Sequence, residues 1–159
     1  HDAKIFTRKD GVVIDSFNVT DFRTHTLVDP ARYEKIEADL RKSIENLMQI
    51  NQEFSNMKSK WWRLESRFFK RKGKIKVNFE DHEKFTIIDV FSPDRLGLLY
   101  TITHKMNELG LSIYFAKIAT RGDDVVDAFY ILDRNGNKVL SHDMDLIKIE
   151  ITKAIKELL

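Results

Sequence analysis

The stretch "FTIIDVFSPDRLGLLYTITHKMNELG", from Phe85 to Gly110, predicts a strand, a tight turn and a helix. Phe85–Phe91 is a dense run of apolar and β-branched residues, which is typical of a strand inside a sheet. Gly97 ends the turn, and Gly110 stands where a helix commonly stops, at the C′ position. Between the two glycines, apolar residues keep the spacing of one buried helix face. They are Leu98, Leu99, Ile102, Met106 and Leu109.

A repeated segment lies on either side of this stretch. "AKIFTRKDGVVIDSFNVTD" begins at Ala3, and "AKIATRGDDVVDAFYILD" begins at Ala116. Each copy reads as strand, polar turn and strand, which is the signature of a β-hairpin. When one inserted residue is allowed in the first copy, Asp15 aligns with Asp127. We attribute this recurring Asp to the common ancestry of two modules.

A helix is predicted after each hairpin. The first begins at Asp29–Pro30, an N-cap acid followed by proline at the first helical position. Its expected buried stripe is Ile36, Leu40, Ile44, Leu47, Met48 and Phe54. The second begins near Ser141, where Asp143 and Asp145 suit the helix N-terminus. Its stripe is Ile147, Ile151, Ala154, Ile155 and Leu158.

The order of elements predicts an α+β fold. From Phe85 the chain reads strand, helix, strand, strand, helix, and one further strand would complete a ferredoxin-like βαββαβ module with both helices on one face of an antiparallel sheet. The first copy lacks the leading strand and helix, so we expect a tandem pair of modules in a piece of a longer protein. The expected divisions are an incomplete first module at 1–57, a connector at 58–73 and a second module at 74–159.

Lys74–Glu80 alternates apolar and polar residues, which predicts a half-buried strand. The short connection Asp81–Lys84 favours a hairpin with Phe85–Phe91. The added strand would fill the sheet edge that the missing last strand of the module leaves open.

Composition excludes several classes of protein. The 159 residues are 42% hydrophobic and 33% charged, with a net charge of +2 and no cysteine. There is consequently no disulfide framework, cysteine-based metal site or thiol nucleophile. No apolar run approaches the ~20 residues of a membrane helix, and no signal segment opens the chain. We expect a cytoplasmic protein without membrane contact.

Positive charge is concentrated in the connector. Lys58–Lys76 holds nine basic residues and one acid, which leaves 18 basic against 24 acidic residues elsewhere. Trp61, Trp62, Phe68 and Phe69 lie among these cations. Aromatic residues between cations suit single-stranded nucleic acid. They equally suit a linker anchored on the protein body, or one that docks on other domains of a parent enzyme. No RRM or KH motif accompanies the run, so nucleic acid is the weaker alternative.

The residues from Phe85 to Asp133 resemble an ACT domain, a small-molecule sensing module of amino-acid metabolism. The resemblance rests on Asp94-Arg95-x-Gly97-Leu98-Leu99 after the first strand, and on "LGLSI" at Leu109–Ile113. Leu96 stands where the family usually has proline. The tandem order of hairpin, long helix, basic stretch and complete module resembles the C-terminal regulatory region of the bifunctional PII uridylyltransferase/uridylyl-removing family, over nearly the whole chain.

This resemblance implies a function in nitrogen metabolism. Such a module would sense glutamine and control uridylylation and deuridylylation of PII signal proteins. Catalysis would belong to other domains of the parent, and the segment itself would need no cofactor. Modules of this family pair with one another, within a chain or as a homodimer. An ACT-type sensor of another amino acid, serving a different enzyme or regulator, remains an alternative.

The predicted ligand site combines the turn with the start of the following strand. Free N–H groups at a helix N-terminus suit a carboxylate, Asp94 suits an ammonium or a helix cap, and Arg95 offers a bidentate donor. The simpler interpretation is an N-cap and a packing glycine. In the family's fold Ser112–Tyr114 would lie beside the turn. The predicted ligand-binding residues are Ser92, Asp94, Arg95, Leu96, Gly97, Leu98, Ser112, Ile113 and Tyr114.

The sequence offers no catalytic or metal-binding motif. The five histidines are scattered, and they form no His-x-x-x-His pair. Neither a phosphate-binding loop nor a Gly-x-Ser-x-Gly context is present. We therefore predict no catalytic residue and no metal ligand in this segment.

Overall fold

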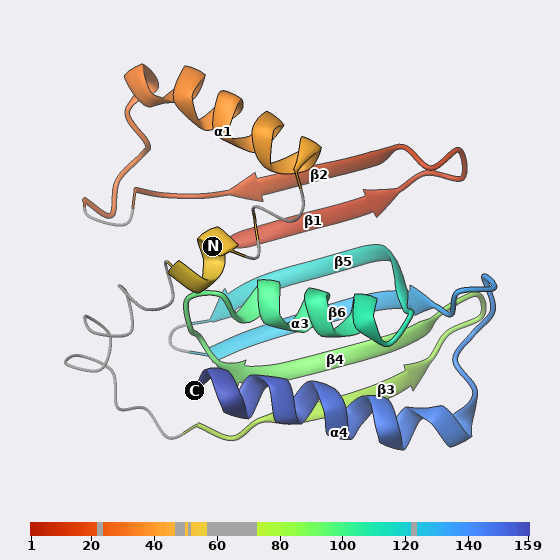
Figure 1. Cartoon of the computed structure of the whole chain (residues 1–159). Helices are drawn as coiled ribbons and strands as arrows, with labels where there is room; N and C mark the ends of the chain where they lie inside the picture. The colour runs from red at the N-terminus through yellow and green to blue at the C-terminus, as the bar shows by residue number, and fades with distance from the viewer. Residues whose placement is uncertain (22–23, 47–49, 51, 57–72, 122–123) are drawn as a thin grey trace. The chain divides into compact units, whose positions relative to one another are not determined.

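The computed structural model describes residues 1–21, 24–46, 50, 52–56, 73–121 and 124–159 (Figure 1). The chain divides into two compact units. The first joins His1–Asn18 to Lys72–Leu159, and the second is Val19–Arg71.

The first unit is a six-stranded sheet in the order β2-β1-β5-β6-β4-β3, and every adjacent pair is antiparallel. The strands are β1 Asp2–Thr7, β2 Val13–Asn18, β3 Lys76–Asp81, β4 Thr86–Pro93, β5 Ser112–Arg121 and β6 Asp124–Leu132. Its helices are α3 Leu98–Glu108 and α4 Ser141–Leu158. The predicted α+β class and antiparallel pairing are confirmed.

Both helices of this unit cover the same face of the sheet (Figure 1). Side chains alternate between the two faces of a strand, so one set from each central strand meets α3 and α4. The fully buried members of this core include Val77, Ile88, Val90, Ile102, Met106, Phe129, Ile131, Ile151 and Ile155. The helix stripes predicted after Gly97 and after Ser141 supply the helical side of the core.

β3 pairs with β4 as the alternation of Lys74–Glu80 predicts, with Val77 opposite Val90. The connection is short, and the His82 N–H donates to the Phe85 carbonyl oxygen at 3.2 Å. β3 therefore occupies one edge of the sheet, beside the first strand of the ferredoxin-like order.

The first hairpin is joined to the same sheet. β1 pairs antiparallel with β5, so that Ala3 lies opposite Ile118, Lys4 opposite Lys117, and Ile5 opposite Ala116. Ala3-Lys4-Ile5 and Ala116-Lys117-Ile118 are the matching segments of the repeat. The pairing is reciprocal: Ala3 lies opposite the repeat equivalent of Ile5, and Ile5 lies opposite the repeat equivalent of Ala3. The two segments are therefore related by a local two-fold axis at the Lys4–Lys117 pair. The two halves of the repeat form one continuous sheet.

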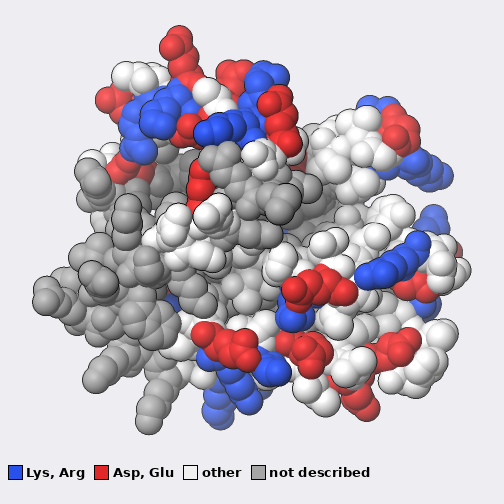
Figure 2. All heavy atoms as spheres, in the orientation of Figure 1, with Lys and Arg blue, Asp and Glu red and all other residues white. Residues whose placement is uncertain are grey.

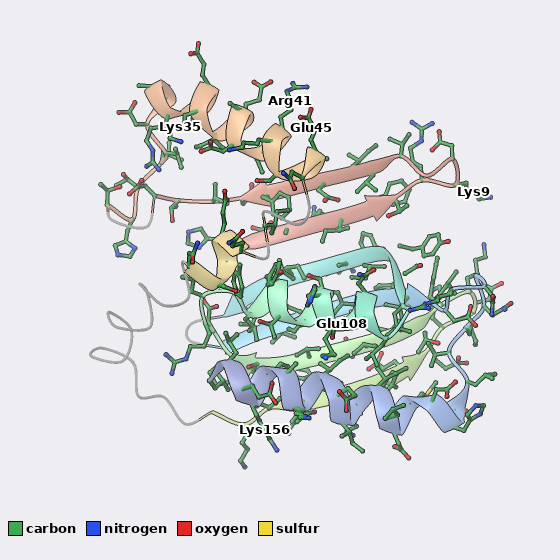
Figure 3. The ribbon with its side chains drawn as sticks, viewed as in Figure 1. Lys9, Lys35, Arg41, Glu45, Glu108 and Lys156 are labelled. Atoms are coloured by element: carbon green, nitrogen blue, oxygen red, sulfur yellow. The ribbon has the colours of Figure 1, made fainter. Side chains whose placement is uncertain are left out.

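The helix α3 ends as the sequence predicts. Gly110 has φ of 75°, and the Leu111 N–H donates to the Met106 carbonyl oxygen at 2.9 Å. A Cβ at Gly110 would lie 2.1 Å from Nε of Arg134. The left-handed backbone therefore favours glycine here, and an added Cβ would also displace the Arg134 side chain. Glu108, in the last turn, pairs with Lys105 at 2.5 Å (Figure 3).

In the second unit, the Asp29 side chain accepts a hydrogen bond from the Ala31 N–H at 3.0 Å, and Pro30 opens a 3-10 turn, Pro30–Arg32. The helix α1 follows at Tyr33–Glu45. Its i,i+4 ion pairs include Lys35–Asp39, and Lys35 and Arg41 are marked in Figure 3. These findings confirm the predicted helix start.

The expected burial of the stripe is wrong for its three residues on α1, whereas Phe54, beyond α1, is half-buried. Ile36, Leu40 and Ile44 are 37%, 59% and 75% exposed. Leu47 and Met48, which the sequence adds to this stripe, lie outside the described residues. The spacing of the stripe follows from helix periodicity, whereas its burial requires a partner surface, which periodicity does not specify.

Candidate functional site

The turn between β4 and α3 is a four-residue turn from Arg95 to Leu98. The Leu98 N–H donates to the Arg95 carbonyl oxygen at 3.0 Å, which closes it. Gly97 has φ of 82° and ψ of 6°, the conformation of the third residue of a type II turn. Glycine is required there because a side chain would strain a positive φ.

Leu96 occupies the second position of this turn, where proline is common. It is 44% exposed, so the side chain carries little of the core. The turn needs an ordinary negative φ at this position, which leucine adopts and which proline would fix.

The helix α3 is not capped by Asp94. Its N-cap residue is Gly97, and no side chain makes a cap hydrogen bond. The capping role that the sequence suggested for Asp94 is therefore wrong, because the tight turn places three residues between this carboxyl and the first helical residue. Asp94 is exposed.

The other turn residues differ in accessibility. Ser92 is 2% exposed, and its hydroxyl donates to the Pro93 carbonyl oxygen at 3.2 Å. Leu98 is buried in the core. Arg95 is half-buried, with its Nε atom buried. Asp94, Arg95 and Leu96 are consequently the accessible or partly accessible side chains of the turn, whereas Ser92 and Leu98 are buried beneath it.

The structure separates the two parts of the predicted site. The end of β4 lies beside the start of β6, since Pro93 pairs with Asp124. The start of β5 lies at the opposite end of the sheet, since Ile113 pairs with Ile131, which in turn pairs with Thr86. The expectation that Ser112–Tyr114 lies beside the turn is therefore wrong within this module.

Ser112, Ile113 and Tyr114 have other surroundings. Ser112 is exposed, and the Ile113 carbonyl oxygen accepts a hydrogen bond from the Thr7 hydroxyl at 3.3 Å. The ring of Tyr114 lies 5.7 Å from that of Phe85. A ligand role for these residues stays a prediction that would require a turn from another module.

The other half of the repeat supplies a strand start at the turn's own end of the sheet. Asp2, the first residue of β1, pairs with Ala119 near the end of β5. By the repeat, His1 and Asp2 correspond to Tyr114 and Phe115. The local two-fold thus exchanges the strand starts, so that the turn after β4 lies at the end of the sheet where β1 begins.

A buried carboxyl, which the sequence analysis attributed to ancestry, lies at the same end of the core. Asp127 is 1% exposed, on the helix-covered face of β6, and accepts a hydrogen bond from the Ala119 N–H at 3.3 Å. Burial raises the pKa of Asp127 to about 7, the Ala119 N–H lowers it in part, and the charge of Asp94 adds to the rise. The repeat equivalent, Asp15, is exposed. The recurrence of Asp at positions 15 and 127 of the repeat was the sequence signal that pointed to this carboxyl.

The remaining candidate regions give fewer constraints. Residues 57–72, with most of the basic connector, lie outside the described residues, so its role stays a prediction. On the described part of the side that carries α3 and α4, acidic and basic side chains are interspersed (Figure 2). Among the described residues, no three His, Asp or Glu side chains could share a metal ion. No helix in the described part is long and apolar enough to cross a membrane.

The turn geometry predicts opposite effects at adjacent positions. Leu96→Pro should raise the free energy of unfolding by about 0.5 kcal/mol, because proline restricts the unfolded chain at a compatible φ. Gly97→Ala should lower it by roughly 1 kcal/mol or more, because φ is positive. Urea denaturation of both variants measures this difference. A destabilising Leu96→Pro together with a neutral Gly97→Ala would contradict the type II assignment.

The buried Asp127 predicts a pH-dependent stability. Between pH 4 and 7 the unfolded chain loses this proton while the folded protein retains it. The free energy of unfolding should therefore fall as pH rises through this window, by about 1.4 kcal/mol for each unit between the two pKa values. In D127N this fall should be smaller, whereas D15N should match the parent chain. Urea denaturation across the window tests this, and parallel profiles for D127N and the parent would refute it.

Comparison with known proteins extends the resemblance. No family model matches the chain, and no solved structure matches it. A bifunctional uridylyltransferase/uridylyl-removing enzyme from Ruegeria pomeroyi is 31% identical over 157 residues, which are 98% of this chain and 17% of that enzyme. An enzyme of the same name from Rhodopseudomonas palustris is 26% identical over 138 residues, 87% of this chain and 15% of its own length.

The chain thus spans about one sixth of the curated relatives it matches. The match to the Ruegeria pomeroyi enzyme covers 157 of the 159 residues of this chain, so it includes both copies of the repeat in this chain. Nearly the whole chain is homologous to a segment of the bifunctional uridylyltransferase/uridylyl-removing enzymes.

Proposed function

We propose that this chain is a glutamine-sensing regulatory region of a bifunctional uridylyltransferase/uridylyl-removing enzyme. The observation that carries the proposal is the homology over 98% of the chain to only 17% of such an enzyme. We assign nucleotidyl transfer to PII signal proteins, and the removal of uridylyl groups from them, to the remainder of the parent protein.

The turn after β4 has the groups that an amino-acid ligand requires. The N–H groups in the first turn of α3 suit the α-carboxylate, and the Arg95 guanidinium suits it as a second, bidentate donor. The exposed carboxyl of Asp94 suits the α-ammonium. Gly97 carries no side chain, so a ligand is able to approach the backbone closely.

The junction of the modules offers a route from binding to regulation. The turn lies at the end of the sheet where β1 begins, so a ligand held there would favour one arrangement of the two modules. It shifts the parent enzyme from adding to removing uridylyl groups only by the difference between its affinities for the two arrangements. The regulated state must reciprocally bind glutamine more tightly.

Titration calorimetry with glutamine tests the proposal on a protein that carries both complete modules. We expect saturable binding, and a loss of roughly tenfold or more in affinity for Asp94→Asn and for Arg95→Gln. The expected loss follows from hydrogen bonds to charged groups, which contribute about 1.5–3 kcal/mol each. Lys9→Ala, at the tip of the first hairpin (Figure 3), is the matched control and should bind as the parent does.

The choice of ligand needs its own comparison. Glutamate, asparagine and serine in the same assay should bind more weakly than glutamine. Preference for another amino acid would leave an ACT-type sensor with a different ligand. Flat traces at millimolar concentrations of every amino acid tested, on a protein shown to be folded, would rule out the sensing function.

A further inference from the structure

Asp127 places a carboxyl inside an apolar core. Its neighbours on the same face of β6 are Val125 and Phe129, both buried, and the buried residues of α3 and α4 are apolar as well. Among the described residues, Asp127 is the one buried residue with an ionisable side chain. A carboxyl without water ionises only where hydrogen-bond donors or nearby charges favour the anion. Few groups therefore control the ionisation of Asp127.

The groups that face this carboxyl come from β5, β4 and the turn. From β5, the Ala119 N–H donates a hydrogen bond to Oδ1 of Asp127 at 3.3 Å. From β4 come Val90, which lies directly opposite, and Ser92, whose hydroxyl does not titrate. Burial raises the pKa of Asp127 most, and the charge of Asp94 in the turn adds to the rise. Asp94 is consequently the charged side chain, among the described residues, that acts on Asp127.

The strand register brings the turn within range of the buried carboxyl. Val90, the partner of Asp127, lies three residue pairs before the end of β4, where Pro93 pairs with Asp124. A strand rises ~3.3 Å per residue, so about 10 Å of strand separates the two pairs. Asp94 follows directly after β4. A charge acts over this distance through an apolar interior with much less screening than in water.

We propose that Asp127 releases its proton to solvent when a ligand with an ammonium group binds beside Asp94, so that the turn prefers ligands that carry this charge. The inference rests on the proposed amino-acid site and adds to it a residue that acts through Asp94. An ammonium offsets the charge of the Asp94 carboxylate and adds a positive charge of its own. Both effects lower the pKa of Asp127, whose value of about 7 lies close to neutral pH. A ligand without an ammonium has neither effect.

Ionisation of Asp127 also strengthens a contact at the junction of the two halves of the repeat. A carboxylate accepts a stronger hydrogen bond than a neutral carboxyl does, so the Ala119 N–H is held more firmly when Asp127 is charged. Ala119 lies opposite Asp2, the first residue of β1. The proton of Asp127 thereby connects a ligand at the turn with the strand pair that joins the repeat.

Counting protons tests the inference on a protein that carries both complete modules. Titration calorimetry with glutamine at pH 6.5, in MES and in imidazole buffer, should show the release of about half a proton if binding lowers the pKa of Asp127 by about one pH unit. The affinity should then rise roughly five- to tenfold from pH 5.5 to pH 8. D127N keeps the size and the acceptor oxygen of the side chain but should lose both effects. D15N, at the exposed repeat equivalent, is the matched control and should keep them.

A measurement without ligand separates this inference from the sensing function. Asp94→Asn removes the charge that acts on Asp127, so the fall in the free energy of unfolding with rising pH should end at a lower pH than in the parent chain. Failure of every amino acid to bind would overturn the sensing function and this inference together. Binding with no proton release, equal proton release in D127N, or an unchanged unfolding profile in D94N would overturn this inference alone.

Discussion

The pairing of β1 with β5 is the constraint on which the rest of the first unit depends. It places Ala3-Lys4-Ile5 against Ala116-Lys117-Ile118 in opposite directions, so that the repeated residues meet about a local two-fold axis. Ala3 and Ala116 are both buried at this junction. Larger side chains at either position would meet the apolar residues packed around them, so the small residues allow the two halves of the repeat to share one sheet.

Because the halves join here, the candidate site and the sheet face opposite α3 and α4 both follow from the same register. The turn from Arg95 to Leu98 lies at the end of the sheet where β1 begins, and the start of β5 lies at the other end. On the opposite face, the same register aligns Phe6 with Phe115 and Lys4 with Lys117. A shift by one residue would move every one of these side chains to the other face of the sheet.

The sequence predicts local features well, because they depend on neighbouring residues. The glycines at 97 and 110, the Asp29–Pro30 helix start, the core stripe of α4 and the β3–β4 pair all follow from short-range rules. The pairing of β1 with β5 does not follow from such rules, because they do not specify which two edge strands will pair with each other. The misplacement of Ser112–Tyr114 has the same cause: the site was predicted from one module, whereas strand order decides which strand start each turn faces. The burial of Asp127 was not predicted, because a polar residue in a strand pattern does not indicate which face of the sheet the helices cover.

The β1–β5 register is tested most directly by cross-linking, since the chain contains no cysteine. Opposite residues of antiparallel strands have Cα atoms about 4.5–5.5 Å apart, within the range that a disulfide spans. Under mild oxidation at low protein concentration, the K4C/K117C variant should form an intramolecular disulfide, detected by mass spectrometry without reductant. D2C/K117C, which is two residues out of register, should stay reduced. Equal cross-linking of both variants, or none in K4C/K117C, would contradict the shared sheet.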